Sequence, residues 1–142
     1  MNLYTYYRSS AAFRVRIALE LKRLSYTSIP IHLLREGGRQ RSPEYAARNP
    51  AQLIPALDVD GATLTQSLAI LEYLEETHPR PALLPADGIG RARVRALALS
   101  IACDIHPLNN LRVLRYLGST LAIEEDRRNA WYRHWIDIGF AA

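Results

Sequence analysis

Residues 54–67 read IPALDVDGATLTQS, a pattern that predicts a β-hairpin followed directly by a helix. Asp60-Gly61 lies between two apolar runs, which predicts a tight hairpin of antiparallel strands, because Asp and Gly accept the positive φ angles of such a turn. Ser67 then opens a helix expected to end near residue 77, with its leucines facing inward and its glutamates facing solvent. The side chains concerned are Leu68, Leu71 and Leu74 on the inner face and Glu72, Glu75 and Glu76 on the outer face.

Upstream of this hairpin the pattern alternates between strands and helices. Short runs rich in β-branched and aromatic residues predict strands at 3–7 and 26–31, and the stretch 11–23 between them predicts a helix. A strand, a helix and a second strand in this order form a βαβ unit with parallel strands. Apolar side chains cover most of the helix, so we expect it to be largely buried. They are Ala12, Phe13, Val15, Ile17, Leu19 and Leu21.

A short helix is predicted to connect the βαβ unit to the hairpin. Ser42-Pro43-Glu44 is typical of a helix start, because Ser caps the first turn and Pro fits there, and Asn49-Pro50 is typical of a helix end. The complete order is β-α-β, α, β-β-α with a mixed four-stranded sheet. This order predicts an α/β domain with a thioredoxin-like arrangement.

The second half of the chain is predicted to be wholly helical. A proline-rich stretch separates it from the first half, as expected of a linker. The expected parts are a thioredoxin-like domain at 1–82, a linker at 83–87 and an all-α, partial helical domain at 88–142. One long helical pattern runs over 91–117, and Pro107 within it is expected to bend the helix. Another helix is expected over 124–140.

Composition excludes several classes of protein. With 142 residues, 49% hydrophobic and 23% charged, the chain matches neither a disordered nor a collagen-like protein. Its apolar runs are short and it starts with a strand pattern, so we expect no secretory leader, no membrane span and a cytoplasmic location. Cys103 is the single cysteine, so no internal disulfide forms, and its apolar neighbours predict a core position. The net charge of +4 is spread over both halves, which favours small anionic ligands over nucleic acid.

Residues 8–14 join the first strand to the first helix at the carboxyl edge of the sheet, where ligands commonly bind. A hydroxyl of Ser9 or Ser10 there, beside the free N–H groups of a helix start, can donate to an anion or a thiolate and lower its proton affinity. The alternative is that either serine only caps the helix. No histidine lies nearby in the sequence to act as a base, so a nucleophilic serine is not supported.

Two further pairs, Ile54-Pro55 and Gln66-Ser67, are expected at the same edge. A cis peptide bond at Pro55 would turn the backbone so that Ile54 offers its N–H and C=O to an extended peptide. Gln66 and Ser67 lie where a helix begins, and a hydroxyl with free N–H groups forms a carboxylate site there. The alternative for Ser67 is a plain N-cap.

A polar segment lies within the long helical pattern of the second half. Asp104, His106, Asn110 and Arg112 lie among apolar residues, and a bend at Pro107 would turn several of them into a cleft. The alternative is a polar helix face, with His106 as a hydrogen-bonded structural residue. No second His or Cys lies at ligand spacing, so no metal site is expected.

These segments resemble the zeta class of glutathione transferases, the family that includes maleylacetoacetate isomerase and the bacterial maleylpyruvate isomerases. Residues 7–19, YRSSAAFRVRIAL, resemble the family signature around its active serine, and residues 66–76, QSLAILEYLEE, resemble its glutathione-binding helix. The resemblance continues through LLP at 83–85, RARVR at 91–95 and IHPLNN at 105–110. It implies that the helical domain is of the glutathione transferase type and that glutathione is the cofactor.

The resemblance also implies which residues surround glutathione. They are Ser9, Ser10 and Ala11 near the thiol, Ile54 and cis-Pro55 along the cysteinyl backbone, Gln66 and Ser67 at the γ-glutamyl carboxylate, Gln40 at the glycine end, and Asp104, His106 and Asn110 from the helical domain. Ser9 and Ser10 would stabilise the thiolate. Arg8 and Arg112 would neutralise the carboxylates of a dicarboxylate keto-acid substrate.

The implied activity is the glutathione-dependent cis–trans isomerisation of maleylacetoacetate or maleylpyruvate, in the breakdown of aromatic compounds including tyrosine, by a homodimer. The alternatives are a general glutathione transferase or peroxidase that acts on small electrophiles, and a non-catalytic glutathione-binding module. Two features depart from the family. Many members have Cys where this chain has Ala11, and the family normally continues for several more helices, so we expect this chain to be part of a longer protein.

Overall fold

A four-stranded mixed sheet forms the centre of the first of two units in the computed structural model, which describes residues 1–141. The first unit is Met1–Leu84 and the second is Pro85–Ala142. The elements of the first unit are β1 (Asn2–Thr5), α1 (Ser10–Leu21), β2 (Thr27–Pro30), α2 (Pro43–Arg48), β3 (Ala56–Val59), β4 (Ala62–Thr65) and α3 (Ser67–Thr77). The sheet order is β2-β1-β3-β4, in which β2 is parallel to β1 and β3 is antiparallel to both of its neighbours. The predicted βαβ unit and mixed sheet are confirmed.

The turn between β3 and β4 has the backbone that its sequence predicts. Asp60 has a φ of 50° and Gly61 has a φ of 80°. Positive φ at both central residues gives a two-residue turn of type I′, whose twist matches that of the flanking strands. The paired residues on either side are Val59 and Ala62, so the predicted hairpin is confirmed.

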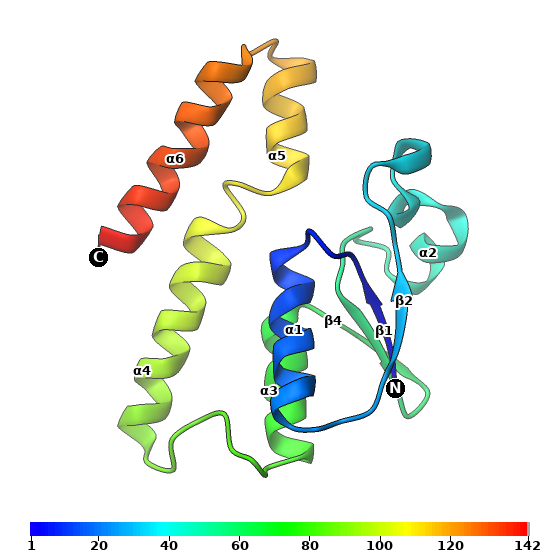
Figure 1. Cartoon of the computed structure of the whole chain (residues 1–142), viewed down its shortest axis with the longest axis vertical. Coiled ribbons are helices and arrows are strands. Elements are labelled where there is room, and N and C mark those ends of the chain that lie inside the picture. Colours follow the sequence, from blue (N-terminus) through cyan, green and yellow to red (C-terminus); the bar gives the residue numbers. More distant parts are fainter. Residues whose placement is uncertain (142) are drawn as a thin grey trace. The chain divides into compact units, whose positions relative to one another are not determined.

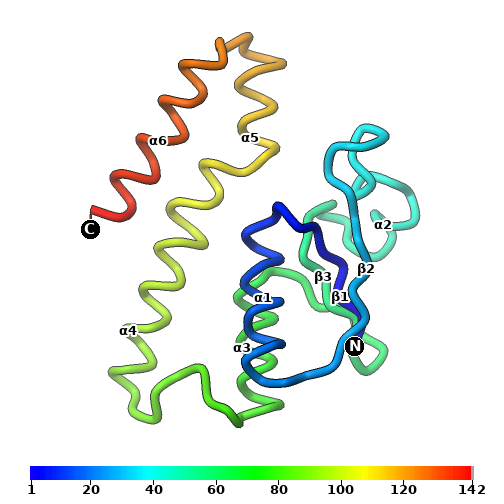
Figure 2. The backbone as a smooth tube through the Cα atoms, viewed as in Figure 1, coloured from blue at the N-terminus to red at the C-terminus, as the bar shows by residue number. Residues whose placement is uncertain are grey.

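The two faces of the sheet carry separate hydrophobic cores, because successive side chains of a strand point to opposite faces. Leu3 and Leu57 face the layer formed by α1 and α3, which lie side by side (Figure 1, Figure 2). Tyr4 and Ala56 face the other side, where Tyr45 of α2 packs. The first core consists of Leu3, Val15, Ala18, Leu19, Leu57, Ile70 and Leu74, and the second consists of Tyr4, Tyr6, Ala12, Tyr45, Ile54 and Ala56.

Helix α1 is buried on one face only, so the expectation of a largely buried helix is wrong. Its buried side chains are Ala12, Val15, Ala18 and Leu19. Phe13, Ile17 and Leu21, spaced four residues apart, form an exposed apolar stripe. A helix that packs on a sheet buries the stripe that faces the sheet, and apolar composition alone does not reveal how many faces have a partner.

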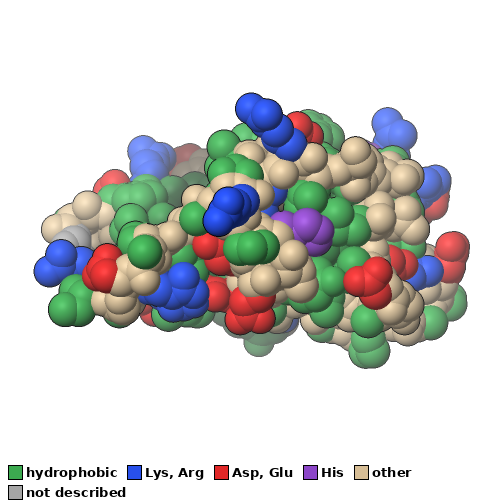
Figure 3. Space-filling view, turned by 90° about the horizontal axis from the view of Figure 1, so that it is seen from below, with side chains coloured by type: hydrophobic (Ala, Val, Ile, Leu, Met, Phe, Trp, Pro, Cys, Tyr) green, Lys and Arg blue, Asp and Glu red, His purple; other side chains and the backbone are tan. Residues whose placement is uncertain are grey.

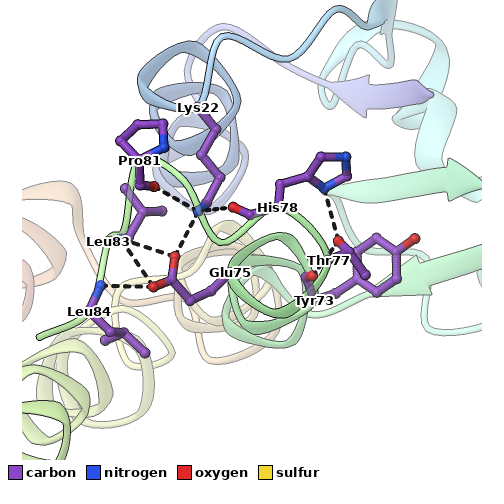
Figure 4. Close-up of polar contacts among 8 residues, drawn as sticks. All are labelled: Lys22, Tyr73, Glu75, Thr77, His78, Pro81, Leu83 and Leu84. Atoms are coloured by element: carbon purple, nitrogen blue, oxygen red, sulfur yellow. Dashed lines mark hydrogen bonds and ion pairs between the residues drawn. The ribbon is translucent and has the colours of Figure 1, made fainter. Parts of the chain in front are cut away.

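A buried ion pair joins the C-terminal ends of α1 and α3 (Figure 4). Lys22 Nζ donates to Glu75 Oε2 at 2.7 Å and to the carbonyl oxygens of His78 and Pro81 at 2.6 and 3.0 Å. The side chain of Lys22 is fully buried and that of Glu75 is 8% exposed. The expectation that Glu75 faces solvent is therefore wrong, because its partner lies 53 residues away and helix periodicity does not reveal it.

The second unit contains only helices and turns in its described residues. Its elements are α4 (Gly88–Leu99), a wide π-helical turn (Ser100–Ile105), α5 (Leu111–Arg115), a second π-helical turn (Tyr116–Thr120) and α6 (Glu125–Ala141). Pro107 does not bend a continuous helix as expected but lies in a turn that ends one helical segment before α5 begins, because proline cannot donate to the helical ladder. Cys103 is exposed, so the expectation of a core cysteine is wrong. The helix expected at 124–140 is confirmed as α6.

Charges of both signs are mixed on the face of the molecule drawn in Figure 3, where Lys and Arg side chains alternate with Asp and Glu. On this face they form no continuous basic surface of the kind that tracks a phosphate backbone. Among the described residues, no helix combines the length and the apolar character that crossing a membrane requires.

Candidate functional site

Strand direction brings four of the predicted segments to one edge of the sheet. β2 is parallel to β1, and two antiparallel steps lead from β1 through β3 to β4, so β1, β2 and β4 all end at this edge. The segments that follow these strands contain Ser9, Gln40 and Gln66 respectively. β3 runs the opposite way, so Ile54 and Pro55, which precede it, lie at the same edge.

Ser9 is the N-cap of α1. Its Oγ accepts a hydrogen bond from the Ala12 N–H at 3.2 Å. A hydroxyl that accepts one bond still has its own hydrogen to donate, so Ser9 can cap the helix and donate to an anion at the same time. The two roles that the sequence left as alternatives are therefore compatible in one side chain. Ser10 is the first residue of α1 and is exposed, and Ala11 beside it is half-buried.

The loop that carries Arg8 is anchored by Tyr6. The Tyr6 carbonyl accepts a hydrogen bond from the Ser9 N–H at 3.0 Å, and the Tyr6 ring packs 4.9 Å from the ring of His32. Burial raises the pKa of Tyr6 and the neighbouring Tyr7 raises it further, so this phenol is neutral at physiological pH. Arg8 itself is exposed and adds positive charge to the edge.

Arg14, which the sequence pattern did not single out, links α1 to the start of α3. Its Nη1 donates to Ser67 Oγ at 3.0 Å, across 53 residues of sequence. The guanidinium is always charged, so it adds to the positive potential at the first N–H groups of the helix. The sequence feature that could have pointed to Arg14 is its position four residues after Ser10, which places it one helical turn away on the same side of α1.

Ser67 is the first residue of α3, so the interpretation of Ser67 as an N-cap is wrong. The N-cap is Gln66, whose side chain makes no capping hydrogen bond. The first N–H groups of α3 therefore lack a side-chain cap. Gln66 has φ 66° and ψ 116°, a backbone conformation that costs a non-glycine residue about 1 kcal/mol or more. This conformation turns the chain from β4 into α3 and is typical of a functional site.

The neighbouring positions also offer unpaired polar groups. The Ile54–Pro55 peptide bond is cis, and the Ile54 N–H has no acceptor among residues 1–141. Gln40 lies in a short 3-10 turn, Arg39–Arg41, and is only 7% exposed. Its Oε1 finds no donor among the residues that the structure describes. A buried oxygen without a donor is costly, which favours a ligand that donates at this position.

The other predicted residues lie in the second unit. Asp104 and Arg112 are exposed, and His106 and Asn110 are half-buried. Asn110 has a structural role, because its Oδ1 accepts a hydrogen bond from the Arg112 N–H at 3.1 Å and caps α5. The part of these four residues in ligand binding stays a prediction.

The edge of the first unit thus has a defined chemical character. It offers a hydroxyl donor at Ser9, an uncapped helix start with the Arg14 guanidinium at Ser67, and a backbone N–H at Ile54 between them. Hydroxyl, guanidinium and free N–H groups all stabilise anions. The arrangement fits an extended, peptide-like anion with a second anionic group near Ser9.

A family model matches the first part of the chain. The family model described as "Glutathione S-transferase, N-terminal domain" matches residues 3–82. A probable maleylacetoacetate isomerase from Vibrio cholerae serotype O1 is 58% identical over 139 residues, which are 97% of this chain and 64% of that protein.

Solved structures match over almost the whole chain. A holo maleyl pyruvate isomerase, described as a bacterial glutathione S-transferase in Zeta class, has a TM-score of 0.95 and 50% identity, covering 99% of this chain and 66% of that one. A maleylacetoacetate isomerase from Methylobacterium extorquens AM1 with bound malonate and glutathione has a TM-score of 0.92 and 44% identity, covering 98% and 64%. The chain thus spans between 64% and 66% of the length of these relatives.

Proposed function

This chain belongs to the zeta class of the glutathione S-transferase family, and we propose that it binds glutathione and serves the glutathione-dependent cis–trans isomerisation of a maleyl keto acid. The relatives named as isomerases of maleylacetoacetate and maleylpyruvate support this proposal. Malonate, which the Methylobacterium extorquens protein holds together with glutathione, is a dicarboxylate like these substrates.

The observation that carries the proposal is the 3.0 Å hydrogen bond between Arg14 and Ser67. This bond brings the segment 7–19 next to the start of α3. These are the two segments that resemble the signature segments of the family. We place the γ-glutamyl carboxylate of glutathione at Gln66 and Ser67, where the uncapped N–H groups of α3 and the guanidinium favour an anion.

The rest of glutathione is proposed to follow the sheet edge. Its cysteinyl backbone pairs with Ile54 before Pro55, and its thiol lies near Ser9, Ser10 and Ala11. At the glycine end, an N–H of the tripeptide supplies the donor that the buried Gln40 Oε1 lacks in the described structure. The groups present therefore fit an extended tripeptide with a carboxylate at its γ-glutamyl end and an N–H donor at its glycine end.

The chemistry follows from these positions. When bound, glutathione would supply a thiolate, a nucleophile that can add reversibly to the activated double bond of a maleyl group and so allow cis–trans rotation. The Ser9 hydroxyl donates to the sulfur and, with the positive end of α1, lowers its proton affinity. Arg8 and Arg112 neutralise the carboxylates of the substrate. Ala11 provides no thiol, so the sulfur comes from glutathione alone.

The proposal also covers residues of the second unit, the oligomeric state and the place of the reaction in metabolism. Asp104, His106 and Asn110 are proposed to help hold glutathione. The active protein is proposed to be a cytoplasmic homodimer that acts in the breakdown of aromatic compounds.

An absorbance assay tests the proposed function. The cis-to-trans conversion of maleylacetoacetate and of maleylpyruvate is followed with and without catalytic glutathione, on this chain and on the whole gene product. We expect turnover that requires glutathione but does not consume it. A product that retains glutathione would point to a general transferase, and tight glutathione binding without turnover would point to a binding module.

Replacing Arg14 with Met is expected to weaken glutathione binding about 10-fold, because a charged hydrogen-bond donor at the carboxylate site is lost. Isothermal titration of the purified chain with glutathione measures the change in Kd. Arg23→Met is the matched control, since it removes the same charge from the opposite end of α1, just beyond Lys22. Equal weakening in both variants would indicate a general charge effect and would contradict a specific role for Arg14.

A further inference from the structure

Two buried side chains converge on one carbonyl group next to the proposed glutathione site. The Tyr45 hydroxyl and the Asn49 Nδ2 both donate to the Leu53 carbonyl oxygen, each at 2.7 Å. Both residues are only 3% exposed. A carbonyl oxygen has two lone pairs, so these two donors satisfy it fully and restrict its direction.

Asn49 also organises the loop over residues 50–53. Its Oδ1 accepts a hydrogen bond from the Ala51 N–H at 3.1 Å, and its carbonyl accepts one from the Gln52 N–H at 2.8 Å. Its own N–H donates to the Tyr45 carbonyl at 2.8 Å at the end of α2. The Asn49 side chain therefore holds the loop at Ala51 and at Leu53, and Tyr45 of α2 holds it at Leu53 as well.

The hold on Leu53 determines where the next N–H points. The Leu53 carbonyl and the Ile54 N–H belong to one peptide unit, which is planar and trans, so the two groups point in opposite directions. With the carbonyl directed at Tyr45 and Asn49, the N–H is directed away from them. This is the N–H that has no acceptor among the described residues.

Tyr45 is itself held firmly against the sheet. Its ring centroid lies 5.7 Å from that of Tyr4. Arg48, one turn further along α2, forms an ion pair with Asp58 of β3 and stacks 4.6 Å from the centroid of the Tyr4 ring. Burial raises the pKa of Tyr45 to about 12, so its hydroxyl remains a donor at physiological pH.

We infer that Tyr45 and Asn49 are positioning residues for glutathione, because their joint hold on the Leu53 carbonyl aims the Ile54 N–H at the cysteinyl carbonyl of the bound tripeptide. This inference rests on the proposed function. Neither side chain needs to touch glutathione. Both act through the peptide unit between Leu53 and Ile54, so their loss weakens binding of the peptide backbone and leaves the groups near the thiol in place.

The test uses Tyr45→Phe in the full 142-residue chain. This change removes the hydroxyl and keeps the ring that packs on Tyr4. We expect the Kd for glutathione, measured by isothermal titration, to rise about five-fold, because the Ile54 N–H is aimed less well and its hydrogen bond to glutathione is weakened. In ¹⁵N–¹H spectra, glutathione is expected to shift the Ile54 amide of the parent chain strongly and that of the variant less. The Tm without glutathione is expected to fall by a few degrees, because one buried hydrogen bond is lost, so the variant stays folded at the temperature of the titration.

Two further variants complete the test. Asn49→Ala removes the second donor to Leu53 and the loop contact to Ala51, and is expected to weaken binding more than Tyr45→Phe. Tyr26→Phe is the matched control, because it removes a hydroxyl from a half-buried tyrosine just before β2, and it should leave both the Kd and the Ile54 shift unchanged.

The outcomes separate this inference from the proposed function. Failure of the parent chain to bind glutathione would overturn both. Normal binding by the parent with an unchanged Kd and Ile54 shift in Tyr45→Phe would overturn the inference alone. Weaker binding and a smaller Ile54 shift in a folded Tyr45→Phe, with no effect of Tyr26→Phe, is the result that the inference requires.

Discussion

Replacing Lys22 with Met is expected to lower the free energy of unfolding of this chain by about 3–5 kcal/mol, because it leaves the Glu75 carboxylate buried without its cation. Glu75 is 7% exposed, and the Lys22 ammonium is its only ion-pair partner among the described residues. The substitution also removes the donor to the carbonyl groups of His78 and Pro81. Urea denaturation followed by circular dichroism measures the change.

A second substitution separates the effect of the buried charge on stability from the effect of the lost packing. Glu75→Gln in the Lys22→Met background removes the charge and keeps an oxygen that accepts from the backbone N–H groups of Leu83 and Leu84. We expect this double variant to recover a large part of the lost stability. Equal losses in the single and double variants would show that the charge is not the cause. Glu36→Gln, which breaks an exposed ion pair with Arg39, is the control and is expected to leave stability unchanged.

The same pair predicts a dependence on pH. Burial by itself raises the pKa of the Glu75 carboxyl, but the hydrogen bonds from Lys22, Leu83 and Leu84 outweigh burial and hold the pKa below its ordinary value of 4.5. A carboxyl with a lowered pKa in the folded state stabilises the fold above its ordinary pKa, and this contribution is lost as the pH falls through the lowered value. In Lys22→Met, protonation instead relieves the buried charge. The stability difference between the parent and Lys22→Met is therefore expected to shrink as the pH falls, above 4.5 because the buried carboxyl of the variant takes up a proton and below 4.5 because the parent loses its contribution.

The second large effect is expected at the other end of α1. Ser9→Ala should lower kcat/KM for glutathione-dependent isomerisation about 100-fold, because a hydrogen-bond donor to the thiolate is removed. It should also cost about 1 kcal/mol of stability through loss of the helix cap. Turnover is measured in the isomerase assay, and the thiolate fraction of bound glutathione is measured by ultraviolet absorbance.

Ser42→Ala separates these two consequences. Ser42 caps α2 with the same geometry as Ser9, since its Oγ accepts from the Tyr45 N–H at 3.2 Å. We expect Ser42→Ala to lose similar stability while the thiolate absorbance of bound glutathione stays that of the parent chain. Ser10→Ala, which removes the neighbouring exposed hydroxyl, shows whether the second serine shares the role. Unchanged turnover in both Ser9→Ala and Ser10→Ala would refute a serine role in stabilising the thiolate.

Local signals predicted most elements of the first unit correctly. Asp60-Gly61 predicted the hairpin, Ser42 and Asn49 the limits of α2, and Ser67 the first residue of α3. Turn chemistry, caps and periodicity act over a few residues, so the sequence alone reveals them. The structure shows the Ile54–Pro55 bond as cis, which the sequence left open.

The wrong predictions concern side chains whose burial depends on residues far away in the sequence. Glu75 follows the polar pattern of its helix but lies against Lys22. Phe13 and Ile17 follow an apolar pattern but are exposed, because an apolar side chain is buried only where another element covers it. Cys103 is exposed for the same reason.

Local patterns predicted the order of strands and helices and the serines at the helix starts, because each depends on neighbours within a few residues. The βαβ order followed by a hairpin then predicted the mixed sheet. Three contacts depend on the folded chain and were not predicted: Arg14 meets Ser67, Lys22 meets Glu75, and α2 holds the Leu53 carbonyl. The first two contacts each join residues 53 apart in sequence. Such pairs come together only when the strands between them align and both helices pack on one face of the sheet, which no local pattern encodes.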